Sequence, residues 1–430
     1  MTYYFVPDEA YCAPATAPFD VGRIRADFPI LRQRVHGHAL AWLDNAATTQ
    51  KPQTVIDRVA RFSAQDNSNI HRGAHTLASR ATEAYEDARA TVARFLGAAT
   101  SDEVVFVRGA TEAINLVAHS FGGRFVRPQD EIIVSHLEHH ANLVPWQRFA
   151  NGRRARLRVV PVGEDGQIRL DALADLLGPR TRLVAIAHVS NALGTIVPVR
   201  EVVAMAHRVG ARVLVDGAQA VPHLRVDVRE LDADFYVFSG HKVFGPTGVG
   251  ALYGKAEILE SMPPWQSGGN MIQDVSLDRT IYRAPPARFE AGTGPIAEAI
   301  GLATALDYVD AIGWDRITSY EHGLLEYATL RLGELPGLRL IGTAAAKAGV
   351  LSFTLEGTAP QKIAAALDRD GIAVRAGHHC AQPILRRFGV EETVRASLAL
   401  YNTRQEIDLL AAGLRRVAAR HARPTYRHHA

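Results

Sequence analysis

The sequence predicts an α/β fold, with a large domain built on a doubly wound, mostly parallel sheet and a smaller α+β domain after it. Two observations lead to this prediction. Short apolar runs alternate with amphipathic helical segments between about residues 100 and 255, which is typical of parallel sheets built from strand–helix–strand units. The chain also has 430 residues, too many for one small core, and its C-terminal part returns to short strands mixed with helices.

We expect an N-terminal extension at residues 1–19 and a large domain at residues 20–312, whose first residues pack on the small domain. A small domain at residues 313–422 and a tail at residues 423–430 would follow. The extension is rich in aromatic residues but has no helical or strand periodicity. It is either a disordered tail or a segment that docks on a partner or on the body of the protein, and Cys12 within it is expected to be a bystander.

Composition excludes several classes of protein. The chain is 47% hydrophobic and 22% charged with a net charge of +3, which is too small to predict nucleic-acid binding. Apolar runs are shorter than a membrane span, and the N-terminus lacks the pattern of a secretory signal. With only two cysteines, the protein is expected in a reducing cytoplasm rather than as a disulfide scaffold.

The first hundred residues contain predicted helices and one short strand. Asp20 caps a short helix, a strand follows at 40–43, and a helix covers about 52–64. A long amphipathic helix spans 76–95 and ends at Gly97. Its predicted core positions are Leu77, Ala81, Tyr85, Ala88, Val92 and Phe95.

The rest of the chain supplies the two predicted sheets. Strands of the large sheet are expected at 103–107, 131–135, 181–189, 212–216 and 235–238, with helices from 108 and at 200–208. Residues 255–295 read as a long functional loop. The C-terminal part is predicted to contain helices at 296–311, 314–332, 360–370 and 403–420 and strands at 338–341, 349–355, 372–375 and 394–400.

Lys242 lies just after the apolar strand at 235–238, which is a poor place for a solvated surface charge. A partly desolvated lysine has a lowered pKa and can form a Schiff base with an aldehyde. Ser239 and His241 beside it are suitable donors to a phosphate, so the group suits pyridoxal 5'-phosphate (PLP). Alternatively, Lys242 is a surface lysine in a turn rich in Gly and Pro.

Asp216 ends the preceding strand, and the carboxyl ends of parallel strands meet at one edge of a sheet. A buried carboxylate there would keep the pyridine nitrogen of PLP protonated, although Asp216 can also be a helix N-cap. Thr111 begins a helix directly after a strand and a glycine, where free N–H groups favour an anion. This threonine can equally be a simple helix cap.

Two further segments carry candidate groups. The pair His139–His140 does not predict a metal site, because neighbouring side chains diverge and no cysteine or carboxylate cluster is near in sequence; stacking of His139 on a planar cofactor is preferred. Cys380 lies in a cationic loop that favours a nucleophilic thiolate, although an inert buried thiol is the alternative. Arg395, within a strand, suits the carboxylate of an amino acid.

These residues stand in motifs that make the chain recognisable. The motifs are NIHRGAHT from Asn69, RGATEAIN from Arg108, EHHAN from Glu138, VDGAQ from Val215, SGHK from Ser239, RAGHHC from Arg375 and RAS from Arg395. Over about residues 20–420 the sequence resembles the SUF-type cysteine desulfurases and related selenocysteine lyases. These are class V aminotransferases of fold type I.

The resemblance implies a role for each matching residue. Lys242 would hold PLP as a Schiff base, Asp216 would pair with the pyridine nitrogen, and Gln219 would bond the phenolic oxygen. His139 would stack on the ring and take part in catalysis. The phosphate would be held by Thr111, Ser239 and His241, and by Thr293 of the partner subunit in a homodimer. The substrate would be bound by Asn191, Arg375, Arg395 and His71.

The implied reaction converts L-cysteine to L-alanine and leaves a persulfide on Cys380, which a sulfur-acceptor protein takes for Fe–S cluster assembly. A selenocysteine lyase, another class V enzyme, or a non-catalytic protein that keeps PLP as a structural element are the alternatives. The segment 356–362 lacks the histidine found in relatives that use a zinc-bearing acceptor, which disfavours such a partner. No resident metal, nucleic acid or membrane is expected to bind.

Overall fold

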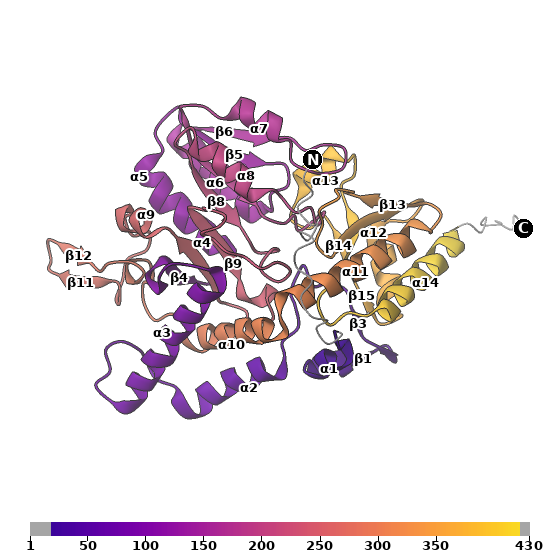
Figure 1. Ribbon diagram of the computed structural model, residues 1–430, viewed down its shortest axis with the longest axis horizontal. Coiled ribbons are helices and arrows are strands. Elements are labelled where there is room, and N and C mark those ends of the chain that lie inside the picture. The colour runs from indigo at the N-terminus through magenta and orange to yellow at the C-terminus, as the bar shows by residue number, and fades with distance from the viewer. Residues whose placement is uncertain (1–18, 422–430) are drawn as a thin grey trace, which may run out of the picture.

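The computed structural model describes residues 19–421 (Figure 1), so the predicted extension, Cys12 and the tail lie outside the described residues. Two larger sheets organise this part of the chain, one with seven strands and one with four. The strand at 40–43 is reduced to β3 (Ala41–Trp42), which pairs in parallel with β15 (Ile372–Ala373). Within residues 19–421, no helix combines the length and the apolar character needed to cross a membrane.

The large sheet confirms the predicted mostly parallel architecture. Its strands, in spatial order, are β4 (Val104–Val107), β10 (Gly250–Gly254), β9 (Phe235–Ser239), β8 (Arg212–Asp216), β7 (Thr181–Ala187), β5 (Glu131–Ser135) and β6 (Arg156–Val160). Strands β9, β8, β7, β5 and β6 run parallel, whereas β10 is antiparallel to both of its neighbours. Strands β6 and β10 were not predicted from the sequence. In β6, arginines alternate with apolar residues, as suits an edge strand.

Helices cover both faces of this sheet. One face packs against α2 (Gln53–Arg61), α3 (Thr76–Leu96), α7 (Leu170–Leu176), α8 (Val199–His207) and α10 (Ile296–Ile312). The other face packs against α4 (Ala110–Val117), the short α5 (Gly123–Phe125) and α6 (Val144–Arg153). Because neighbouring strand residues point to opposite faces, a central strand such as β9 is apolar and fully buried, whereas the edge strand β6 is only partly buried.

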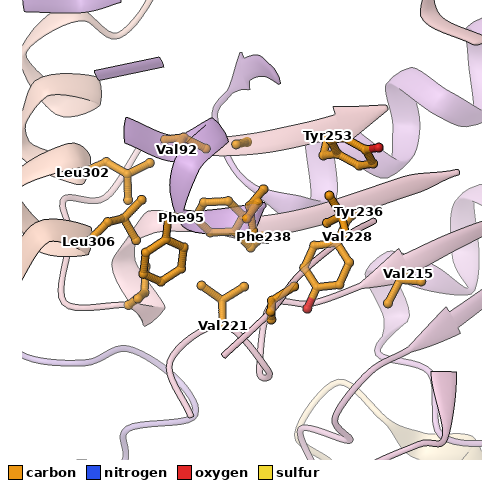
Figure 2. Packing of buried hydrophobic residues seen from close by; sticks show 14 of the residues in the cluster. Val92, Phe95, Val215, Val221, Val228, Tyr236, Phe238, Tyr253, Leu302 and Leu306 are labelled. Atoms are coloured by element: carbon orange, nitrogen blue, oxygen red, sulfur yellow. The ribbon is translucent and has the colours of Figure 1, made fainter. Parts of the chain in front are cut away.

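On the α3 side, residues of α3 and α10 pack against one face of the large sheet. Figure 2 shows Phe95 of α3 and Leu302 and Leu306 of α10 beside Phe238 of β9, all within one buried cluster. Leu77 was predicted to face this core, but 41% of it is exposed. Its neighbours on the helix are buried through the series Ala78, Ala81, Tyr85, Ala88 and Val92, and Leu77 is turned away from that stripe.

The small sheet is antiparallel and consists of β13 (Leu338–Ile341), β14 (Val350–Leu355), β17 (Thr393–Ser397) and β16 (Arg375–Gly377). The predicted strand at 372–375 is therefore split between β15 and β16. The helices of this part are α11 (Trp314–Gly333), α12 (Pro360–Asp368), α13 (Gln382–Arg387) and α14 (Arg404–His421). Gly313 separates α10 from α11, and the predicted domain boundary there stays a prediction.

The N-terminal elements lie beside β3, β15 and the start of α14 (Figure 1). They are α1 (Val21–Ala26), β1 (Arg34–Val35) and β2 (His38–Ala39). Asp20 caps α1 as predicted, and Arg25 forms an ion pair of 3.0 Å with Glu406 at the start of α14.

The segment 255–295 is more structured than the predicted loop. It contains α9 (Ala256–Ser261) and a hairpin of β11 (Ile272–Val275) and β12 (Thr280–Tyr282). Figure 1 shows this hairpin projecting from the body of the molecule. Its strands are short and largely exposed, so they lack the buried apolar run from which the other strands were predicted.

Candidate active site

A cavity of about 210 Å³ lies at the carboxyl ends of the parallel strands. Ala187, Asp216 and Ser239, the last residues of β7, β8 and β9, line it from the large sheet, and Arg375 and Arg395 line it from the small sheet. The predicted site residues that border this cavity are Thr111, His139, Asn191, Asp216, Gln219, Ser239, His241, Lys242, Arg375 and Arg395.

Lys242 and Asp216 form the polar centre of the cavity. Lys242 ends a short 3-10 turn after β9, lines the cavity and is half-buried. Burial lowers its pKa to about 8, although the charge of Asp216 acts in the opposite direction. Burial raises the pKa of Asp216, and the charge of Lys242 offsets part of this shift. Both groups are therefore desolvated, and the charge of each partly reverses the pKa shift that burial causes in the other.

One end of the cavity is built to receive an anion. Helix α4 begins after Gly109, whose φ of 155° is a conformation that L side chains rarely adopt. A Cβ on Gly109 would lie 3.1 Å from Ser239 Oγ, so glycine keeps this end open. Ser239 Oγ accepts a hydrogen bond of 2.9 Å from the N–H of Ala110, which leaves its hydroxyl proton free to donate. Thr111 lies in the first turn of the same helix.

His139 and His241 are held neutral beside these groups. Burial and the charge of Lys242 lower the pKa of His139 to about 3 and that of His241 to about 4. The Nδ1 of His139 accepts a hydrogen bond of 3.0 Å from the N–H of Ala141, so its proton is on Nε2. A neutral imidazole fixed in this way presents a flat face suited to stacking.

A buried carboxyl supports the segment beneath His139. Glu138 is 1% exposed and lies 2.5 Å from Ser135 Oγ and 2.6 Å from Asn142 Nδ2. Burial raises its pKa to about 8, to which the charge of Asp216 also contributes. The hydrogen bonds that Ser135 Oγ and Asn142 Nδ2 donate to Glu138 hold the turn that carries His139.

Arg395 and Asn191 leave polar atoms unpaired in the cavity wall. Arg395 is 1% exposed and donates hydrogen bonds to the carbonyl oxygen of Asn191 (2.9 Å) and to Asp44 Oδ1 (3.1 Å). Among residues 19–421, Arg395 Nε and Asn191 Oδ1 have no hydrogen-bond partner. A buried donor and acceptor left in this state fit a ligand with a carboxylate and an amine.

Cys380 lies outside the cavity lining but close to it. It sits between β16 and α13, and His379 and Cys380 have φ angles of 51° and 54°. Two successive non-glycine residues in the left-handed region are strained, and such strain gathers at functional loops. The carbonyl oxygen of Cys380 accepts a hydrogen bond of 2.7 Å from the N–H of His140. The charge of Cys380 contributes to raising the pKa of both Lys242 and Arg395, against the larger effect of burial.

Besides Cys380, the predicted site residues Thr293 and His71 do not line the cavity. Thr293 borders a second cavity of about 210 Å³ together with Asn69, Arg72 and Asn270. His71 lies 2.8 Å from Glu86, and its ring meets that of Tyr85 edge-on.

The class V aminotransferase family ("Aminotransferase class-V") matches residues 41–410. The chain belongs to this family.

Curated relatives within this group carry more specific names. The "Probable cysteine desulfurase" of Mycolicibacterium paratuberculosis and the "Cysteine desulfurase" of Synechococcus elongatus are each 61% identical over 93% of this chain. The chain spans less than two thirds of these two proteins, 58% and 64%. The "Cysteine desulfurase" of Dickeya dadantii is 52% identical, and the match covers 93% of this chain and 97% of that protein.

Solved structures agree with the class V fold. The cysteine desulfurase CsdA of Escherichia coli has a TM-score of 0.87 at 39% identity, covering 94% of this chain and 99% of its own. The apo cysteine desulfurase of Thermococcus onnurineus has a TM-score of 0.86 at 38% identity, covering 91% of this chain and 98% of its own. The predicted fold type I architecture is confirmed.

Class V aminotransferases depend on PLP, and the cavity of this class V chain fits that cofactor. Lys242 and Asp216 are desolvated on neighbouring strand ends, and Gly109, which lacks a Cβ, keeps the space beside Ser239 open. Gln219 Nε2 is already engaged, because it donates a hydrogen bond of 2.7 Å to the carbonyl oxygen of Ala46.

Sequence reasoning missed some residues around the site. Asp44 directly follows the predicted strand at 40–43, so the strand-end argument used for Asp216 would have found it. His140 was considered only as the neighbour of His139. Its contact with Cys380 joins segments 240 positions apart, for which the sequence carries no local signal.

Proposed function

We propose that this protein is a PLP-dependent cysteine desulfurase that converts L-cysteine into L-alanine and retains the sulfur as a persulfide on Cys380. The observation that carries the proposal is a strained, thiol-bearing loop beside a cavity that holds Lys242, Asp216 and Arg395. An ordinary aminotransferase has no use for the thiol. The names and the 52–61% identity of the relatives support the same activity.

The residues of the cavity divide into cofactor-holding and substrate-holding groups. Lys242 would hold PLP covalently, Asp216 would face the ring nitrogen, and His139 would lie against the ring. Ser239, His241 and Thr111 would donate hydrogen bonds to the phosphate. When bound, PLP supplies an electron sink that stabilises negative charge at the substrate Cα.

The chain's own groups then perform the remaining steps. The unpaired Nε–H of Arg395 and the nearby Asn191 fix the substrate carboxylate, with Arg375 on the same wall. Lys242 takes the proton from Cα, which its lowered pKa favours. The Cys380 thiolate attacks the substrate sulfur, the bond from that sulfur to Cβ breaks, and Cβ gains a proton. Enzyme thiol and L-cysteine thus give enzyme persulfide and L-alanine, with no external oxidant.

The proposal includes a homodimer, a sulfur-acceptor protein and a cytoplasmic location. Thr293 and His71 lie away from the Lys242 cavity of their own chain, which supports contributions across a subunit interface. Cys380 is partly exposed on its loop, as transfer of sulfur to an acceptor requires. The two cysteines of the chain fit a reducing compartment.

The deciding experiment measures alanine released from L-cysteine in the presence of a thiol reductant, for wild type and Cys380→Ala side by side. We expect alanine from wild type and a loss of at least about 100-fold in the variant, because the nucleophile is gone. Equal rates would remove Cys380 from the chemistry and favour another class V reaction. Alanine from L-selenocysteine alone would assign a selenocysteine lyase instead.

A further inference from the structure

Three metal-ligating side chains meet beside the cavity without lining it. The ligand atoms of His140, His378 and Cys380 all lie within 4.8 Å of one another. His140 comes from the turn after β5, whereas the other two come from the loop after β16. The N–H of His140 bonds to the carbonyl oxygen of Cys380 at 2.7 Å, and the N–H of Gln382 points to His140 Nε2 at 3.5 Å.

Both imidazoles turn an unprotonated nitrogen toward the cysteine loop. His378 Nδ1 accepts a hydrogen bond of 3.0 Å from the N–H of Cys380, and His140 Nε2 accepts the long one from Gln382. A neutral ring nitrogen that accepts only a backbone N–H keeps the lone pair that a metal ion uses.

We propose that His140, His378 and Cys380 form a binding site for a thiophilic divalent cation of the zinc type. Zinc bound to nitrogen and thiolate sulfur holds its ligand atoms roughly 3.5 Å apart, so the three atoms need to approach by at most roughly 1.3 Å. On binding, the Cys380 thiol loses its proton to solvent, and the two ring nitrogens exchange their backbone hydrogen bonds for the metal.

The ligand set selects the class of cation. Two imidazoles and one thiolate suit Zn²⁺ and its borderline-soft neighbours, whereas Mg²⁺ and Ca²⁺ require oxygen ligands. Three protein ligands leave a fourth position for water, which His378 and the partly exposed Cys380 make accessible. The site is thus open, like a catalytic zinc site, and not closed like a structural one.

Occupation of this site has a consequence that rests on the proposed function. A sulfur lone pair shared with zinc is withdrawn from attack on the substrate, so bound zinc makes the desulfurase reversibly inactive. The cation would also hold the loop after β16 against the turn after β5. The cluster thereby ties the reactivity of Cys380 to the concentration of free zinc.

The test uses the cofactor-loaded protein without substrate. Zinc chloride is titrated by calorimetry, and the rate of iodoacetamide alkylation of Cys380 is followed by peptide mass spectrometry. We expect stoichiometric binding and alkylation slowed at least about 10-fold, with recovery after a chelator is added. Magnesium chloride is expected to leave the alkylation rate unchanged.

Variants separate the three-ligand site from simple thiol binding. His140→Ala and His378→Ala should each weaken zinc binding at least about 100-fold, more than the loss of a second-shell partner usually does. Cys12→Ser and the exposed His322→Ala are matched controls expected to bind zinc as wild type does. Circular dichroism and cofactor content verify that each variant is folded.

Two results would overturn the proposal. One is the absence of stoichiometric zinc binding; the other is binding that disappears in Cys380→Ser but survives both histidine variants. Alanine formation from L-cysteine in chelated, metal-free buffer is measured separately. Failure of that assay would count against the desulfurase function and leave the zinc result standing.

Discussion

Arg395 on β17 donates a hydrogen bond of 3.1 Å to Asp44, so the buried cation of the candidate substrate site is held by a carboxylate from the N-terminal part of the chain. Burial raises the pKa of Asp44, and the charge of Arg395 counteracts this rise. Asp44 and the carbonyl oxygen of Asn191 occupy two of the guanidinium nitrogens, and Nε is left for a ligand.

Replacement of Arg395 by lysine should weaken binding of L-cysteine more than it slows the reaction. Lysine keeps the positive charge but cannot satisfy Asp44, Asn191 and a carboxylate in one plane. Loss of a charge-assisted hydrogen bond is worth about 1.5–3 kcal/mol, so KM should rise about 10- to 100-fold while kcat changes less. Steady-state kinetics with Arg386→Lys, an exposed control, would test this; an unchanged KM would contradict it.

Lys242 predicts a pH dependence of stability in the cofactor-free protein. Its pKa falls from 10.5 to about 8 on folding, because burial disfavours the charged form. Between these values the unfolded chain binds more protons than the folded one, so this group's contribution to stability rises with pH across the window.

The matched comparison is with cofactor-free Lys242→Met. The free energy of unfolding of wild type, relative to that of the variant, should increase between pH 8 and pH 10.5 by at most about 3 kcal/mol. Urea titrations at several pH values measure this difference. A difference that is flat or falling with pH would show that Lys242 keeps its charge in the fold.

Glu138 predicts a contribution to stability that falls as pH rises, opposite to that of Lys242. Burial raises its pKa from 4.5 to about 8, so the folded protein binds more protons than the unfolded chain between these values. Stability from this group is complete below pH 4.5 and is lost as pH rises through about 8. Glu138→Gln keeps the shape of the side chain without its charge. The free energy of unfolding of this variant, relative to that of wild type, should therefore increase with pH across that window. Urea unfolding of both proteins at pH 4.5 and above pH 8 tests this prediction. A difference in the free energy of unfolding that stays constant with pH would refute it.

The sequence predicted the centre of the site because one physical rule connects strand ends with ligands. Asp216, Ser239 and Lys242 follow buried apolar runs, and parallel strands bring such positions to one edge. The anion end was predicted from a strand, a glycine and a helix start. These signals are local, so periodicity and residue type suffice to find them.

The parts that escaped prediction depend on contacts between distant segments. His140 meets Cys380 because the small sheet is placed against the turn after β5, and no local pattern encodes that placement. Strand β6 was missed because its arginines break the apolar run, and the β11–β12 hairpin because few of its residues are buried. Thr293 poses a further problem, since its predicted role requires a second chain.

Mixed dimers give the sharpest test of that role. Lys242→Ala and Thr293→Ala chains would each be inactive or weak alone, and they are coexpressed so that both occur in one dimer. If Thr293 completes the cavity of the partner subunit, a mixed dimer has one intact site, which restores about a quarter of the sites under random pairing. Alanine release from L-cysteine measures the recovery.

Lys242→Ala with Cys380→Ala is the control without recovery, because both residues serve the same chain's cavity. No recovery in the first mixture would place Thr293 in its own chain's site or outside the chemistry.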